Sequence, residues 1–330
     1  MPVESDTLSK NARGGTELMK LRMMQEVADE LLEPFQIFVS RIETPLDPAK
    51  IRVLWSHDLP QDPACDPLRN GGWSQFDAFV FNSSWQMQCF HEHIGIPYSR
   101  SVVLQNAIDP IQTIQKTSKK IRMVYHPTPH RGLSILVPVF EKLCQLYDDI
   151  ELDIFSSFEL YGWSERDIPY QELFQRCKEH PRIHYHGSVS NTQVKEALAS
   201  AHIFAYPCIW TETSCIALIE AMSAGLICVH PNLGALFDTS GGLTRMYQWQ
   251  ENITTHSNHF FKHLVKAIED VRNGLTMEES RFIKNYADTR FSWKNRADEW
   301  RAFLQSLLKE KQEILSERTR APHPFYVYKS

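Results

Sequence analysis

The chain has 330 residues, of which 42% are hydrophobic and 23% are charged, and its formal net charge is −5. This composition excludes an intrinsically disordered chain, and a mildly acidic balance with both signs mixed argues against nucleic acid as the main partner. The length is too great for one ordinary core and predicts two domains.

Short β-rich runs alternate with helical patterns, which predicts parallel sheets of the α/β type. In chain order, the first series of expected elements is a helix over 17–32, strands over 35–41, 51–56 and 78–81, a helix over 84–93 and a strand over 101–104. The second series is a strand over 121–125, a helix over 133–147, strands over 151–155 and 183–186, a helix over 191–200, a strand over 202–206, a helix over 214–224 and a strand over 226–230.

The two series predict two doubly wound domains, which leave a cleft between them as the usual place for a ligand. The polar, Lys-bearing stretch 112–120 is interpreted as the connector. We therefore expect an N-terminal domain over 1–110 with an atypical start, and a C-terminal domain over 111–293.

The end of the chain carries one more amphipathic helix, expected over 294–314. Its apolar residues recur at helical spacing: Trp300, Phe303, Leu304, Leu307 and Leu308. We expect this helix to pack back on the N-terminal domain and residues 315–330 to form a tail.

The seven cysteines include no C-x-x-C pair, and residues 1–11 are polar without an apolar segment. Both features predict reduced thiols and a cytoplasmic location. They are compatible with peripheral contact to a membrane.

Two carboxylates frame an unusually apolar run. Glu212 lies eight residues before Glu220, which is the one charged residue between Thr213 and Pro231. Thr213 or Ser214 can cap the expected helix over 214–224, whose first N–H groups form an anion site.

If the run between the carboxylates were helical throughout, its eight residues would span about 12 Å. That is roughly the length of a sugar joined through a pyrophosphate to a ribose, which would place Glu212 near the sugar and Glu220 near the ribose. The alternative is that Glu220 is a structural carboxylate paired with a buried Arg or Lys, since burial of an unpaired one is costly.

The stretch from Glu212 through Glu220 to Gly225 resembles the E-x7-E signature of retaining glycosyltransferases of family four. The resemblance covers most of residues 100–305 and includes the segments 184–189, 191–207, 230–235 and 291–293. It implies the GT-B fold, in which two Rossmann-like domains face each other across a cleft.

The resemblance also implies a function. A sugar would pass from a UDP- or GDP-linked donor to a glycan or lipid-linked acceptor with retention of configuration, and no metal would be required. Glu212 would hold sugar hydroxyls, and the donor would contact Glu220 and the helix start at Thr213, Ser214 and Cys215.

Further donor contacts are expected in two loops. After the strand over 121–125, the family carries an Arg and then a Lys before Gly; His126 stands at the first position, and Arg131 with Gly132 at the second. Gly14 and Gly15 resemble the family's first glycine loop, where the backbone can approach a ligand closely. The alternatives are a solvated loop cation for Arg131 and an ordinary turn for the glycines.

His57 follows a strand and resembles a family histidine that contacts the transferred sugar; a capping or core histidine is the alternative. The pairs His91-x-His93 and His184-x-His186 have a spacing found in zinc sites, but with no third ligand they are interpreted as structural. No Asp-x-Asp metal motif occurs in the chain.

Two other classes of function remain open from the sequence. One is a sugar-nucleotide epimerase of the same fold, and the other is a non-catalytic nucleotide- or glycan-binding protein. A NAD-dependent oxidoreductase is disfavoured, because no G-x-G-x-x-G follows any expected strand.

Overall fold

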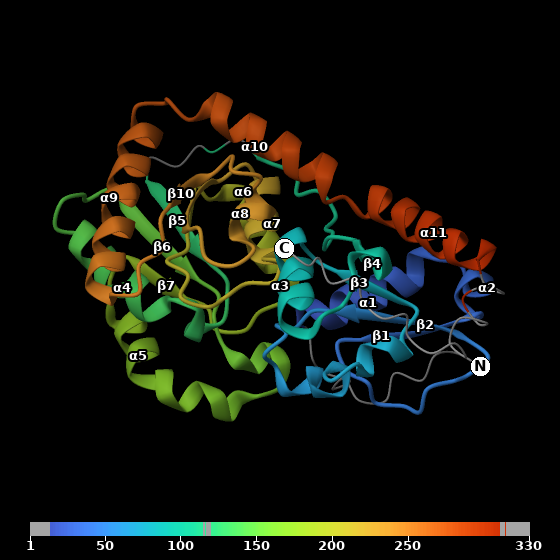
Figure 1. Ribbon diagram of the computed structural model, residues 1–330. Coiled ribbons are helices and arrows are strands. Elements are labelled where there is room, and N and C mark those ends of the chain that lie inside the picture. Colours follow the sequence, from blue (N-terminus) through green and yellow to red (C-terminus); the bar gives the residue numbers. More distant parts are fainter. Residues whose placement is uncertain (1–13, 115, 117–119, 311–313, 315–330) are drawn as a thin grey trace, which may run out of the picture. The chain divides into compact units, whose positions relative to one another are not determined.

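The computed structural model describes residues 14–114, 116, 120–310 and 314. These residues form two compact α/β units (Figure 1). Unit 1 comprises Asn106–Asn295 with the described start of the chain up to Met19; unit 2 comprises Lys20–Gln105 with the described residues from Arg296 onward. The expected atypical start over 1–11 and the expected tail lie outside the described residues.

Unit 1 is built on a six-stranded parallel sheet of order β10-β9-β8-β5-β6-β7. Its strands are β5 (Ile121–Tyr125), β6 (Ile150–Ile154), β7 (Ile183–Tyr185), β8 (Ile203–Ala205), β9 (Ile227–Pro231) and β10 (Arg245–Tyr247). The central strands β8 and β9 are buried along their whole length, as is typical of a parallel sheet covered on both faces.

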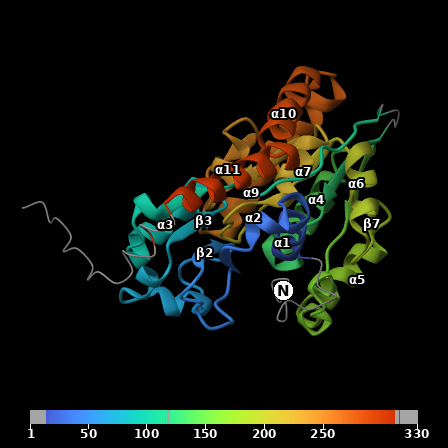
Figure 2. The same cartoon turned by 90° about the vertical axis from the view of Figure 1, so that its right-hand side faces the viewer.

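Helices cover both faces of this sheet. They are α4 (Leu133–Leu143), α5 (Gln171–Glu179), α6 (Asn191–Ser200), α7 (Ile216–Ser223), α8 (Leu236–Ser240), α9 (Ile253–Arg272) and α10 (Met277–Arg290). Helices α4, α5 and α9 lie on one face and α6, α7 and α8 on the other, while α10 packs against α7 (Figures 1 and 2).

Unit 2 has a four-stranded parallel sheet of order β1-β2-β3-β4. Its strands are β1 (Phe35–Val39), β2 (Ile51–Ser56), β3 (Ala78–Phe81) and β4 (Ser101–Val103), and its helices include α2 (Asp29–Leu32) and α3 (Ser84–Ile94). Helices α1 (Gly15–Glu26) and α11 (Trp293–Lys309) each run from unit 1 into unit 2.

Helix α11 contributes to the core of unit 2. Its Trp300 ring lies edge-on to Trp55 of β2, with centroids 4.9 Å apart, and Arg301 Nη2 donates to the carbonyl of Glu26 at 2.5 Å. The chain passes between the units at Met19–Lys20, Gln105–Asn106 and Asn295–Arg296, so the described part of the stretch 112–120, which was interpreted as a connector, belongs to unit 1.

Most expected elements are confirmed, several with the same bounds, namely β2, β3, β5 and α6. The helix expected over 17–32 is wrong as one element: it divides into α1 and α2 because Ala28 adopts an extended backbone with φ −62° and ψ 140°. The strand β10 and the helices α5, α8, α9 and α10 were not predicted.

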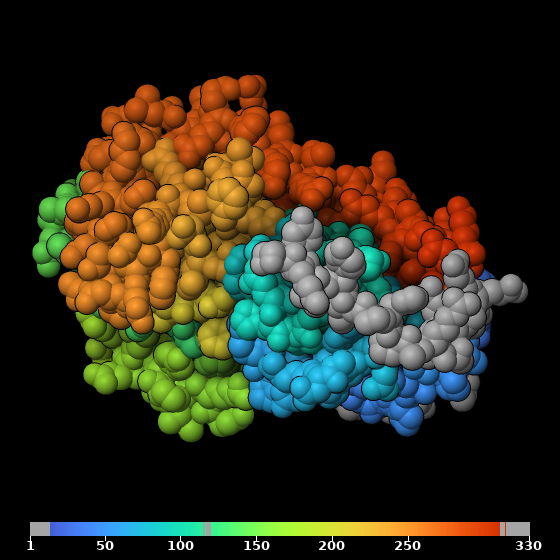
Figure 3. Space-filling model, in the orientation of Figure 1, coloured from blue at the N-terminus to red at the C-terminus, as the bar shows by residue number. Residues whose placement is uncertain are grey.

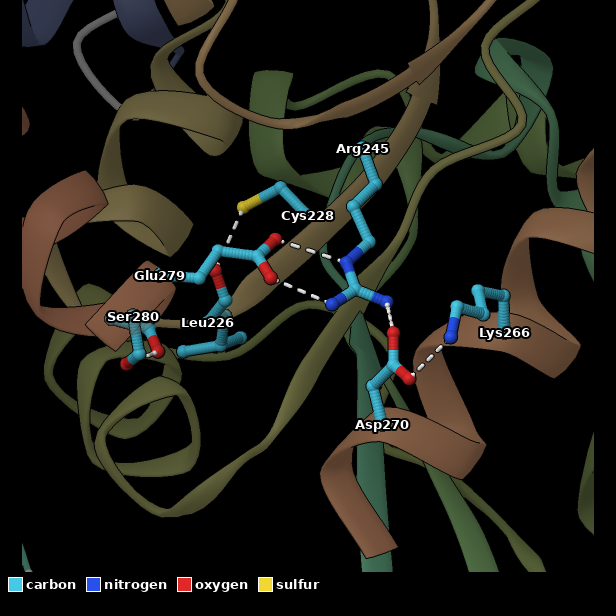
Figure 4. A network of polar contacts seen from close by, with 8 residues as sticks. Leu226, Cys228, Arg245, Lys266, Asp270, Glu279 and Ser280 are labelled. Atoms are coloured by element: carbon cyan, nitrogen blue, oxygen red, sulfur yellow. Dashed lines mark hydrogen bonds and ion pairs between the residues drawn. The ribbon is translucent and has the colours of Figure 1, made fainter. Parts of the chain in front are cut away.

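An ion-pair network ties β10 to the last two helices of unit 1 (Figure 4). Arg245 Nε and Nη2 donate to the two carboxylate oxygens of Glu279 at 2.9 and 2.6 Å, and Nη1 donates to Asp270 at 2.7 Å. Lys266 adds a second cation on Asp270 at 2.7 Å. The Arg245 side chain is 17% exposed. Its partners lie on α9 and α10, which form much of the outer surface of unit 1 in Figure 3.

We predict that Arg245→Met lowers the free energy of unfolding by about 2–3 kcal/mol, because two largely buried carboxylates lose their shared cation. The control is Arg281→Met, which breaks the exposed pair between Arg281 and Glu278 and should cost less than about 0.5 kcal/mol. Urea unfolding at pH 7 measures both.

The pH dependence of the free energy of unfolding gives a second check on Arg245→Met. Hydrogen bonds from Lys266 and Arg245 lower the pKa of Asp270 against the opposing effect of burial. The stability that ionised Asp270 gains from these cations is therefore fully present above the ordinary pKa of an aspartate. It is lost as the pH falls through the lowered pKa of Asp270. Equal losses of unfolding free energy for the two variants at pH 7, where Asp270 is ionised, would contradict the structural role of Arg245.

Candidate functional site

The candidate site lies where two neighbouring central strands of unit 1 end. Strands β5 and β8 pair in parallel, and the chain leaves β5 toward α4 on one face and β8 toward α7 on the other. The carboxyl edge at such a switch point is the usual ligand position in open α/β sheets. The loops after β5 and β8 carry most of the predicted site residues.

Gly132 brings these two loops together. A Cβ at this position would lie 2.3 Å from the carbonyl oxygen of Pro207, and the backbone φ of +135° is one that L side chains rarely adopt. The N–H of Ile209 donates to the carbonyl of Arg131 at 3.2 Å. Gly132 is therefore required for the close approach of the loops.

The Glu212 carboxylate is buried, with the residue 4% exposed. Its Oε1 accepts hydrogen bonds from Arg131 Nη1 and from the Tyr206 hydroxyl, the latter at 2.5 Å. The carboxylate thus has a cation and a neutral donor on the same oxygen, which compensates the cost of its burial.

The loop after β9 fixes the backbone of Glu212. The N–H of Ala235 donates to the Glu212 carbonyl at 2.8 Å. A Cβ on Gly234, whose φ is +59°, would lie 2.6 Å from the same carbonyl oxygen. Three loops, following β5, β8 and β9, therefore converge on Glu212.

Arg131 is not a solvated loop cation, so that alternative is wrong. Its side chain is 24% exposed and is paired with Glu212. Burial opposes the charge, but the Glu212 carboxylate outweighs it and raises the pKa of Arg131. Nε also donates to Thr128 Oγ1 at 3.2 Å. Arg131 and Glu212 therefore form one ionic unit.

Glu220 is partly buried on α7, and its neighbour is a histidine rather than the Arg or Lys of the structural alternative. His126 Nε2 lies 3.3 Å from Glu220 Oε2. Among the described residues, neither ring nitrogen of His126 has a hydrogen-bond partner, although the side chain is buried.

The predicted cap of this helix is wrong. Helix α7 begins at Ile216, and Cys215 is the N-cap residue, with its Sγ accepting from the N–H of Leu218 at 3.4 Å. Thr213 and Ser214 are half-buried residues of the preceding loop. The run from Glu212 to Glu220 is therefore not helical throughout, and the 12 Å estimate, which assumed about 1.5 Å per residue, does not apply.

The glycine loop at the start of α1 reaches the same region of unit 1. A Cβ on Gly14 would lie 2.4 Å from Tyr161 Cε1, and one on Gly15 would lie 2.8 Å from Ile216 Cδ1, at the start of α7. Tyr161 in turn interacts electrostatically with Arg131. The two glycines thus lie beside residues that contact the Arg131–Glu212 pair and α7.

Tyr161 and Tyr206 are site residues that the sequence analysis missed. Tyr206 directly follows β8, and its position at a strand end was the available signal. Tyr161 ends a short helix over Phe158–Tyr161 and had no comparable signal, because its contacts are with residues far away in the sequence.

His57 belongs to unit 2, whereas the other predicted site residues belong to unit 1. It follows β2, its N–H donates to Ser40 Oγ at 3.0 Å, and its ring lies 4.7 Å from that of Trp55. Its role in sugar contact stays a prediction.

Two buried carboxamides fix the backbone on either side of His57. Gln86 Nε2 donates to the carbonyls of Ser56 at 3.2 Å and Asp58 at 2.8 Å, and Asn82 Nδ2 donates to the Ser56 carbonyl at 2.9 Å. Neither residue was singled out from the sequence.

The remaining histidine pairs have protein neighbours. His91 Nδ1 and His93 Nδ1 lie 3.0 and 2.9 Å from backbone carbonyl oxygens, and His186 Nε2 lies 2.9 Å from Asp153. Within the described ranges, no cluster of three or more His, Cys, Asp or Glu residues could hold a metal ion. No helix of that same part of the chain is long and apolar enough to cross a bilayer.

Residues 105–238 match the family described as "Glycosyl transferases group 1". The chain is 26% identical over 205 residues to a phosphatidylinositol N-acetylglucosaminyltransferase subunit of Homo sapiens, covering 59% of this chain and 39% of that protein. It is 29% identical over 115 residues to the Arabidopsis thaliana protein of the same name, covering 35% and 23%. The chain thus spans well under half the length of these relatives.

The fold has solved counterparts. A glycosyltransferase from Rickettsia africae matches with a TM-score of 0.64 at 16% identity, over 95% of this chain and 84% of that one. Anabaena HepE in complex with UDP-glucose matches with a TM-score of 0.60 at 16% identity, over 78% and 73%. The fold is GT-B, as predicted, and the sequence matches support a glycosyltransferase.

The geometry of Gly132 generates a stability prediction. Gly132→Ala should lower the free energy of unfolding by about 3 kcal/mol or more. The new Cβ would sit on a residue with an unfavourable φ and would clash with the Pro207 backbone, which, unlike a side chain, cannot rotate away. The matched control is Gly274→Ala, with φ +69° and no atom within 4 Å of its Cβ, which should cost only about 1–2 kcal/mol.

Chemical denaturation measures the loss for each variant. If Gly132→Ala and Gly274→Ala lowered the free energy of unfolding equally, the close contact between Gly132 and Pro207 would be contradicted.

Proposed function

We propose that the chain transfers a sugar from a nucleoside-diphosphate sugar to an acceptor, with retention of configuration and without a metal ion. One observation carries the proposal. Within the stretch that matches group 1 glycosyltransferases, two carboxylates gather with Arg131 and His126 at the carboxyl ends of β5 and β8. Carboxylates that accept from hydroxyls and a cation that pairs with phosphate are the groups that a nucleotide sugar requires.

In the proposed site, Glu212 holds hydroxyls of the transferred sugar. The diphosphate lies against the exposed edge of Arg131 and the N–H groups at the start of α7, next to Thr213, Ser214 and Cys215.

Glu220 accepts hydrogen bonds from the ribose hydroxyls of the donor. His126 Nε2 lies beside the Glu220 carboxylate, and His126 Nδ1, buried without a hydrogen-bond partner among the described residues, is left to bind the donor. Gly14 and Gly15 let the backbone approach the phosphates closely.

The proposed chemistry is a front-face transfer. The bond between the sugar and the diphosphate breaks, negative charge develops on the leaving phosphate, and the fixed donors around it stabilise that charge. The leaving phosphate takes the proton of the acceptor hydroxyl as the new glycosidic bond forms. His57 is proposed to contact the sugar from unit 2.

The names of the relatives narrow the substrates to be tried. They point to N-acetylglucosamine as the sugar and to a phosphatidylinositol as the acceptor, which makes the acceptor lipid-linked. Structural neighbours solved with UDP point to uridine as the base. We propose these as the first donor and acceptor, together with a cytoplasmic location and peripheral contact with the acceptor's membrane.

The other functions considered from the sequence are less well supported. The curated relatives that match are transferases, which disfavours an epimerase. Slow hydrolysis of UDP-N-acetylglucosamine to free sugar and UDP would exclude a non-catalytic binding protein.

We predict different effects for the two carboxylates. Glu212→Gln should lower turnover by a factor of about 10² or more, because its sugar contacts strengthen in the transition state, while the affinity for UDP hardly changes. Glu220→Gln should weaken the binding of both UDP and the donor. Initial rates and calorimetric titration of both variants measure this.

The reverse pattern, with UDP binding lost in Glu212→Gln and unchanged in Glu220→Gln, would reverse the assignment. If neither variant changed rate or binding, the proposed function would be wrong.

Metal independence is tested on the wild-type protein. UDP should raise the melting temperature by mass action, and the increase should persist when EDTA is added and free divalent ions are removed. A shift that disappears with EDTA and returns with Mg²⁺ or Mn²⁺ would show that the cations of the chain do not suffice.

A further inference from the structure

Trp210 presents a large aromatic surface two residues before Glu212. The residue is 46% exposed, whereas its neighbours in the loop are buried or half-buried. Arg131 connects the two side chains: its Nη1 pairs with Glu212, and its Cζ lies 6.0 Å from the centroid of the Trp210 ring. An exposed indole therefore lies beside the buried carboxylate of the candidate site.

The indole is held in place in spite of its exposure. The ring of His130 meets it edge-on, with centroids 4.7 Å apart and an interplanar angle of 87°. His130 is itself stacked on Phe158 at 5.1 Å and 17°. Burial, aided by Arg131 and Arg166, lowers the pKa of His130 to about 4, so at neutral pH it packs as an uncharged ring.

The backbone below the indole is fixed as well. The Trp210 carbonyl accepts from Cys208 Sγ at 3.0 Å, and the N–H of Ile209 donates to the carbonyl of Arg131 at 3.2 Å. Contacts from both the ring and the backbone thus set the orientation of the exposed surface before any ligand arrives, which reduces the entropy lost on binding.

We propose that the exposed surface of Trp210 binds the apolar C–H face of the donor's sugar ring. A pyranose has such a face and a rim of hydroxyls. This loop offers a partner to each: the Trp210 indole for the face, and the Glu212 carboxylate, which Arg131 holds in place, for the hydroxyls. The proposal rests on the proposed function, because it assumes that Glu212 holds the transferred sugar.

The experiment compares UDP with a UDP-sugar, so that the sugar's contribution is measured separately from that of the nucleotide. The wild-type protein is titrated calorimetrically with UDP, UDP-N-acetylglucosamine and UDP-glucose, and the tighter-binding sugar nucleotide is used further. The variants are Trp210→Ala, Trp210→Phe and the control Phe282→Ala, which removes an exposed aromatic ring from α10.

Trp210→Ala should raise the Kd of the UDP-sugar about 3- to 10-fold, the range for a specific contact of an aromatic ring, while the Kd of UDP changes less than twofold. Trp210→Phe should recover most of the loss, and Phe282→Ala should match the wild type. An unchanged Kd for the UDP-sugar in Trp210→Ala would overturn the proposal.

A loss that is equal for UDP and the UDP-sugar would also overturn it, since it would place the indole at the nucleotide. A different result would contradict the proposed function itself, namely that the wild-type protein binds neither UDP nor a UDP-sugar.

Discussion

The ion pair between Arg131 and Glu212 is the interaction on which the candidate site depends. Glu212 is buried, and a buried carboxylate without a cation would cost several kcal/mol or become protonated. Its cation comes from the loop after β5, whereas Glu212 follows β8. The pair therefore forms only when the two loops meet, and the contact of Gly132 with Pro207 is what lets them meet.

The same pair organises residues that are distant in the sequence. Tyr206 and Arg131 donate to the same carboxylate oxygen of Glu212, and Tyr161, against which Gly14 lies, interacts electrostatically with Arg131. The loop after β9 holds the Glu212 backbone through Ala235. A substitution at any of these positions acts on Glu212, even where its own side chain cannot reach a ligand.

The sequence predicted most strands of the sheets well because buried parallel strands are largely apolar runs: β3 is apolar throughout, and β2 and β5 are each interrupted by one arginine near the start. It predicted the helix boundaries less well. Nothing local marks the break at Ala28, which is neither Gly nor Pro, and Cys215 caps α7 where a neighbouring Thr or Ser was the more ordinary choice.

The pairing of the site residues could not be predicted from the sequence either. Arg131 and Glu212 are 81 positions apart, and only the parallel pairing of β5 with β8 brings them together. The sequence analysis named both residues, but it interpreted Arg131 either as a cation that binds phosphate or as a solvated loop cation. It expected a buried partner for Glu220 and not for Glu212.

The central claim is that Arg131 neutralises Glu212 and also presents positive charge to the donor diphosphate. Calorimetric titration of UDP into Glu212→Gln and into the double variant Arg131→Gln/Glu212→Gln tests it most directly, since neither protein retains an unpaired buried carboxylate at this position. We expect the double variant to bind UDP more weakly by about 1.5–3 kcal/mol, the contribution of a charge-assisted hydrogen bond. Equal affinities for UDP would show that Arg131 serves Glu212 alone, and would contradict the account.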